Sequence, residues 1–71
     1  MNRIREMREI RKIGFSQYHL AALSGIVQNR ISLIERGLVK PSKAEMEKIS
    51  TALGAQVQEV FPENVQRDSH L

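Results

Sequence analysis

The chain contains no cysteine and no tryptophan among its 71 residues. The lack of cysteine excludes disulfide bridges and thiolate metal sites, and it suits a reducing cytoplasm, where we expect the protein to act. No apolar run approaches the roughly 18 residues that a transmembrane helix needs. The first residues, MNRIREMREIRK, lack the continuous apolar stretch of a secretion signal. A chain of this length forms one domain, which pairing with a second subunit would stabilise.

Side chains that carry catalysis or bind metals are scarce and scattered. His19 and His70 are the only histidines and lie far apart, and Asp68, the only aspartate, lies near the end of the chain. Glu45 and Glu47 are two residues apart, so they point to different sides of a helix. No glycine-rich loop with nucleotide-binding spacing occurs. We therefore expect no enzymatic activity, no metal, no cofactor and no small-molecule substrate.

The positive charge is concentrated in the first part of the chain. The net charge is +3, but residues 1–43 hold nine Arg and Lys against three Glu, whereas residues 44–71 hold two against five acidic residues. The first part is therefore expected to attract polyanions. Taken alone, this split is equally compatible with charges that only solvate a surface.

The spacing of apolar residues, glycines and prolines predicts an all-helical fold. We expect five helices, over residues 3–13, 17–24, 28–36, 43–53 and 56–61. In the first, Asn2 caps the helix and the apolar stripe is Ile4, Met7, Ile10 and Ile13. In the fourth, Ser42 and Glu45 form a capping box, and Met46, Ile49 and Leu53 share one face. The domain spans residues 1–62, and residues 63–71 form a tail that frays or joins a dimer contact.

The segment QYHLAALSGIVQNRISLIER, residues 17–36, has the pattern of two helices that cross closely. Ser16 is a good cap for the first of them, whose apolar side is Leu20, Ala21 and Leu23. Gly25 lies at the turn, where a positive φ is cheap only without a side chain. Ile26, Ile31 and Ile34, together with Leu20, fill the space between the two helices.

This pattern resembles the lambda-repressor-like, Cro-type helix-turn-helix family. The resemblance covers residues 14–61 and includes GFSQ at 14–17, LAALSGI at 20–26, ISLIERG at 31–37, PS at 41–42, and KISTALG followed by EVF at 48–61. It implies a compact, all-α, five-helix lambda-repressor-like DNA-binding domain. In the docking geometry that it implies, the helix at 28–36 lies in the major groove of double-stranded DNA and the start of the helix at 17–24 touches the DNA backbone.

Four outward residues of the helix at 28–36 are predicted to contact bases. The amides of Gln28 and Asn29 match the N6/N7 edge of adenine, and Ser32 reaches either a base or a phosphate. Leu33 meets a thymine methyl group, or it is an isolated surface leucine. The alternative for Gln28 and Asn29 is that they are ordinary solvated residues at the start of a helix.

A second group is predicted to contact the DNA backbone. Gln17 matches the family's glutamine at the start of the second helix, where an amide and main-chain N–H groups meet a phosphate. The basic candidates flank the helix at 28–36 or end the first helix, and they are Arg30, Arg36, Lys40, Lys43, Arg8, Arg11 and Lys12. The alternative for each of them is a solvated side chain without a phosphate partner.

Two positions depart from the family pattern. Val27 stands where Ser, Thr or Pro is usual, so the helix at 28–36 lacks a side-chain cap worth about 1 kcal/mol. The family's arginine that pairs with the glutamate of IERG has no clear counterpart, because Ile10 occupies the position where it is expected. We expect Arg11 to pair with Glu35, with Arg8 as a neighbouring candidate.

The sequence thus predicts a sequence-specific transcriptional regulator that binds a partly palindromic operator as a homodimer. Its dimer contacts are expected to be Val57, Val60 and Phe61, unless these residues only close the core of the monomer. The alternative function is a protein-interaction module of the same fold, such as an antitoxin or partner-binding regulator in which DNA binding is secondary. The basic, amide-rich face of residues 28–43 favours DNA.

Overall fold

A computed structural model of the chain describes residues 2–10 and 16–62. These residues form five helices and no strand, which confirms the predicted all-helical fold. The helices are α1 (Ile4–Glu9), α2 (Gln17–Ser24), α3 (Gln28–Glu35), α4 (Lys43–Leu53) and α5 (Val57–Val60). None of the helices in these two ranges has the length and apolar character that a bilayer crossing needs.

The helix ends follow the capping residues and glycines of the sequence. The Ser16 hydroxyl accepts a hydrogen bond from the N–H of His19 at 3.0 Å and begins α2. The Ser42 hydroxyl and the Glu45 carboxylate form the predicted capping box that begins α4. Gly25 ends α2 at φ 76° and Gly54 ends α4 at φ 71°, where a side chain would be strained. The bounds of α2 and α4 match the predicted ones, whereas α3 ends one residue before the predicted residue 36 and α5 is shorter by one residue at each end than the predicted 56–61.

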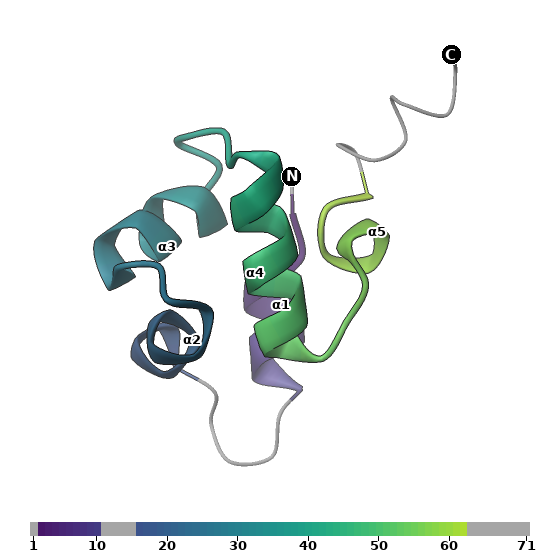
Figure 1. Cartoon of the computed structure of the whole chain (residues 1–71), viewed down its shortest axis with the longest axis horizontal. Helices are drawn as coiled ribbons and strands as arrows, with labels where there is room; N and C mark the ends of the chain where they lie inside the picture. The colour runs from purple at the N-terminus through teal and green to yellow at the C-terminus, as the bar shows by residue number, and fades with distance from the viewer. Residues whose placement is uncertain (1, 11–15, 63–71) are drawn as a thin grey trace.

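Helix α4 lies at the centre of the molecule (Figure 1). α2 and α3 lie on one side of it, α5 on the other, and α1 runs behind it. α2 packs against both α3 and α4, and α5 packs against α4. This arrangement leaves one side of the α2–α3 pair facing away from the rest of the domain.

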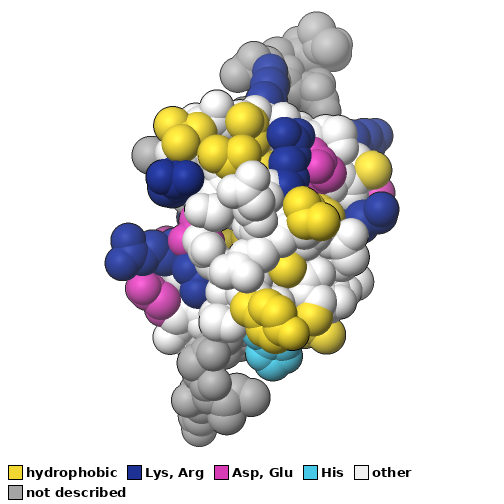
Figure 2. Space-filling view, turned by 90° about the vertical axis from the view of Figure 1, so that its left-hand side faces the viewer, with side chains coloured by type: hydrophobic (Ala, Val, Ile, Leu, Met, Phe, Trp, Pro, Cys, Tyr) yellow, Lys and Arg dark blue, Asp and Glu magenta, His cyan; other side chains and the backbone are white. Residues whose placement is uncertain are grey.

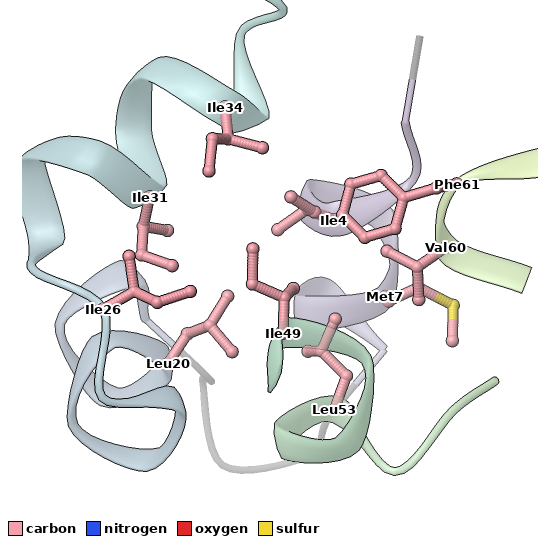
Figure 3. Close-up of a cluster of buried hydrophobic side chains, with 10 residues drawn as sticks. All are labelled: Ile4, Met7, Leu20, Ile26, Ile31, Ile34, Ile49, Leu53, Val60 and Phe61. Atoms are coloured by element: carbon pink, nitrogen blue, oxygen red, sulfur yellow. The ribbon is translucent and has the colours of Figure 1, made fainter. Parts of the chain in front are cut away.

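A single apolar core joins the five helices (Figure 3). Its ten buried side chains are Ile4, Met7, Leu20, Ile26, Ile31, Ile34, Ile49, Leu53, Val60 and Phe61. The four residues that were predicted to fill the space between α2 and α3 are all among them. Burial of such side chains contributes roughly 1.5–3 kcal/mol each to the stability of the fold. The burial of Ile31 and Ile34 holds α3 against the other helices.

Two apolar residues that the sequence placed on buried stripes are exposed. Ile10 is 61% exposed and Leu23 is 57% exposed. A spacing of three residues turns by 300°, so Ile10 is rotated by about 120° from Ile4 around the helix axis. α1 itself ends at Glu9, and the predicted continuation through residues 11–13 falls outside the described residues, as does the predicted tail.

Candidate nucleic-acid interface

The outer side of α3 presents uncharged polar side chains. Gln28 and Asn29 are exposed in its first turn, and Ser32 and Leu33 one turn later are half-buried. Ile31 and Ile34, on the side of the same helix that faces the core, are completely buried, and Asn29 lies opposite them. The helix is therefore amphipathic, and the amide side chains of Gln28 and Asn29 are accessible to a ligand.

Figure 2 shows the side of the molecule on which α2 and α3 lie. Uncharged polar side chains and backbone occupy much of the middle of this face, with apolar side chains among them, and most Lys and Arg side chains lie toward its edges, next to some acidic ones. Of the predicted backbone contacts, Arg36, Lys40 and Lys43 are exposed, and Gln17 is half-buried at the start of α2. Arg11 falls outside the described residues. A polar centre with basic edges suits a polyanion whose interior carries hydrogen-bonding groups.

The start of α3 has no side-chain cap, as the sequence predicts. Val27 occupies the cap position with φ −59° and ψ 147°, and no side chain accepts a hydrogen bond from the first turn. Val27 is also 71% exposed. The N–H groups of this turn therefore lack a side-chain acceptor, and a phosphate or a base edge can accept from them.

Replacing Val27 with serine is expected to raise the free energy of unfolding by about 1 kcal/mol, because a serine oxygen can accept from the first turn of α3. Val27 is exposed, so the replacement removes no core contact. Urea unfolding followed by circular dichroism measures the change. Val27→Ala, which cannot cap, is the control; equal stability of the two variants would contradict the assignment.

The partner of Glu35 is Arg8, which corrects the predicted pairing with Arg11. Nε and Nη2 of Arg8 donate to the two carboxylate oxygens of Glu35 at 3.1 and 2.8 Å. The two side chains are only 14% and 7% exposed. α1 carries the core residues Ile4 and Met7 on one side, and Arg8, next to Met7, is thereby directed toward the end of α3.

Arg30, which was predicted to contact a phosphate, pairs with Glu45 of α4. Its Nε and Nη2 donate to Oε2 and Oε1 of Glu45 at 2.9 and 3.0 Å. Together with hydrogen bonds from Ser42, this pairing lowers the pKa of Glu45 from the ordinary 4.5 to about 2. Sequence reasoning gave Glu45 its capping role but missed its second partner, because the contact joins residues that are 15 positions apart.

The lowered pKa of Glu45 gives a pH dependence with a definite sign. The folded protein stabilises the carboxylate form, so its contribution is present above about pH 4.5 and disappears as the pH falls toward 2. Glu45→Gln is expected to flatten the acid limb of stability in this window, as measured by urea unfolding at a series of pH values. Glu47→Gln removes the same charge outside the pair and is the control; an equal flattening in both variants would contradict the prediction.

The predicted dimer contacts are largely core residues. Val60 and Phe61 are 0% and 1% exposed, so their side chains close the monomer and present no surface to a second subunit. Val57 keeps partial exposure while packing against the core. The sequence could not separate the two alternatives, because a four-residue helix is too short for its periodicity to distinguish a buried face from an exposed one.

A contact that sequence reasoning assigned differently lies at the other end of α3. Asn2 was predicted to cap the first helix, but Arg3 occupies the cap position of α1. The side chain of Asn2 accepts from the N–H of Ile4 at 3.1 Å and donates from Nδ2 to the carbonyl oxygen of Ile34 at 2.8 Å. Asn2, just before α1, therefore satisfies one of the carbonyl groups left open at the end of α3.

The described residues include no group of three or more His, Asp or Glu side chains that could hold a metal ion. Comparison with protein families matches residues 4–60 to the family described as Helix-turn-helix. No curated protein and no solved structure matches the chain. The family match covers all five helices, including the two that form the exposed polar and basic face.

Proposed function

Because the chain belongs to the lambda-repressor/Cro-type helix-turn-helix family of DNA-binding regulators, we propose that it reads a specific DNA sequence through α3 and regulates transcription there. The observation that carries the proposal is the division of α3 into two sides. Ile31 and Ile34 are fully buried, whereas Gln28 and Asn29 are exposed in the first turn. The core thus holds the helix on its buried side, and the amide side chains of its first turn stay accessible to bases.

Base recognition is assigned to Gln28, Asn29, Ser32 and Leu33, as the resemblance implies. A side-chain amide donates and accepts together, which matches the N6/N7 edge of adenine in the major groove. Leu33 is half-buried, so only part of its side chain is available for a thymine methyl group. Gln17, Arg36, Lys40 and Lys43 supply the backbone contacts, and these set the salt dependence of binding.

We further propose that the protein binds as a homodimer on a partly palindromic site. Two copies of α3 roughly 34 Å apart would then enter successive major-groove faces on one side of the duplex. The excess of acidic residues after residue 44 supports a C-terminal region turned away from DNA, with Val57 as the remaining predicted contact. Selection of bound sequences from a random DNA pool, together with sedimentation of the selected complex, tests site, symmetry and stoichiometry at once.

Two substitutions separate base reading from backbone contact. Gln28→Ala is expected to relax preference at one base position, because a bidentate amide contact discriminates by about 1–3 kcal/mol. Lys43→Ala is expected to weaken binding to all duplexes alike and to reduce the salt slope by about one. Fluorescence anisotropy with the selected site and its single-base variants measures both. If the two variants lose only overall affinity, the base-contact assignment is wrong.

The second candidate is a protein-interaction module, and exposed apolar side chains favour it. Tyr18 is 72% exposed and Val27 is 71% exposed. Both line an open hollow beside the start of α3. Binding of random duplex that ignores ionic strength would support this candidate, because contacts to phosphates make DNA affinity fall steeply as salt rises.

A further inference from the structure

The Arg30–Glu45 pair joins the first turn of α3 to the first turn of α4. Arg30 is the third residue of α3 and Glu45 is the third residue of α4. The guanidinium makes two parallel hydrogen bonds to the carboxylate, at 2.9 and 3.0 Å. This fork-to-fork geometry fixes orientation as well as distance.

Both members of the pair also hold the loop between the helices. Oε1 of Glu45 accepts from the N–H of Ser42 at 2.8 Å, and Nη2 of Arg30 donates to the carbonyl oxygen of Lys40 at 3.4 Å. One carboxylate thus contacts α3 and the start of α4 at the same time. A shift of α3 relative to α4 would break several of these hydrogen bonds together.

The pair is poorly suited to bind a phosphate. The positive charge of Arg30 is matched by the negative charge of Glu45 at hydrogen-bonding distance, so the two groups together offer a phosphate no net charge. Arg36, Lys40 and Lys43, in contrast, have no acidic partner among residues 2–10 and 16–62.

The first turn of α3 needs such a contact. It has no side-chain cap, and the polar contacts at Ile34 and Glu35 hold the opposite end of the helix. Gln28 and Asn29 precede Arg30 directly in the sequence. A side chain that must match a base edge has to be held in position to within about half an ångström. In this turn, the ion pair of Arg30 with Glu45 is the contact that can hold it.

We propose that Arg30 and Glu45 are positioning residues, which hold the first turn of α3 so that Gln28 and Asn29 meet their bases, and that Arg30 is not a phosphate ligand. This inference rests on the proposed function. Positioning and simple electrostatics predict opposite changes in DNA affinity when the carboxylate of Glu45 is removed. Removing a negative charge near DNA should tighten binding if charge alone matters, whereas removing this carboxylate should weaken sequence-specific binding if it positions α3.

The test is Glu45→Gln in the full chain, with two probes: the duplex recovered by selection and a randomised duplex of the same length. Glutamine is accepted at this position of a capping box, so α4 keeps its cap. Circular dichroism and thermal unfolding check that the variant is folded. We expect affinity for the selected duplex to fall by about three- to tenfold, and affinity for the randomised duplex to stay constant or rise slightly. Glu47→Gln should change both affinities by the same factor.

A double-mutant cycle tests whether the two residues act as a pair. Adding Glu45→Gln to Arg30→Ala should not lower the affinity for the selected duplex any further, because Arg30→Ala has already removed the ion pair. The inference alone is overturned if the wild type discriminates between the duplexes and Glu45→Gln leaves that ratio unchanged. A wild type that does not discriminate between the two duplexes overturns the proposed function and the inference with it.

Discussion

Replacing Arg8 with methionine is expected to lower the free energy of unfolding by about 3–5 kcal/mol, because it leaves the carboxylate of Glu35 without its buried partner. Glu35 is 7% exposed, and both of its oxygens accept from Arg8. Methionine retains most of the length of the arginine side chain, so the loss reports on charge and hydrogen bonding more than on packing. Urea unfolding at neutral pH measures it.

The control for this prediction is Arg5→Met. Arg5 pairs with Glu9 at 3.1 Å, but the two side chains are 74% and 61% exposed, so the loss should be about 0.5 kcal/mol or less. The double variant Arg8→Met/Glu35→Leu should recover much of the lost stability, because it removes the isolated charge as well. A loss below 1 kcal/mol for Arg8→Met alone would contradict the role assigned to the pair.

Replacing Ile31 with alanine is expected to cost about 2–5 kcal/mol, since it removes buried methyl and methylene groups and leaves a cavity. Ile31 is 0% exposed and lies on the inner side of α3. Against the 5–15 kcal/mol of total stability usual for a domain, this is a large fraction. DNA binding should fall with the folded population, although no group that faces the duplex has changed.

Two variants bracket the Ile31 prediction. Ile31→Val removes one methylene group and should cost about 0.5–1.5 kcal/mol. Leu38→Ala removes a side chain that is 62% exposed, and it should cost less than about 0.5 kcal/mol. Thermal and urea unfolding give the ranking. If Ile31→Ala and Leu38→Ala are equally mild, α3 is not held by the core in the way described.

Helix positions could be read from the sequence where a local signal sets them. Ser16 and Ser42 cap the helices that follow them, and Gly25 and Gly54 end them with a positive φ. These contacts lie within a few residues, so no knowledge of the tertiary arrangement is needed. The same applies to the missing cap at Val27, which is a property of one side chain and the turn beside it.

Contacts between distant segments were harder to predict. The choice between Arg8 and Arg11 for Glu35 depends on how α1 is rotated against α3, and a three-residue apolar spacing leaves that rotation loosely defined. The same looseness placed Ile10 on the buried stripe, although it is 61% exposed. The partner of Glu45 depends in turn on the path of the α3–α4 loop.

The sequence predicted the exposed side of α3 better than it predicted which apolar residues near α5 are buried. The exposure of Asn29 follows from the burial of Ile31 and Ile34, because Asn29 lies on the opposite side of the same helix. Gln28, three residues before Ile31, lies closer to the buried side and is exposed in the first turn of the helix. For Val60 and Phe61, no second set of residues on the same helix indicated which side is buried. A short helix at the end of the core offers apolar residues that suit a monomer interior and a subunit contact equally well, and burial decided for the interior.

The way in which α3 is held determines how small a working fragment of this protein can be. The helix has eight residues, too few to be stable in isolation, and its polar anchors come from Asn2, Arg8 and Glu45 on two other helices or their flanks. An excised peptide of residues 16–37 would lack all three. Grafting this candidate DNA-binding surface onto another scaffold would therefore require the flanking helices to be carried along with α2 and α3.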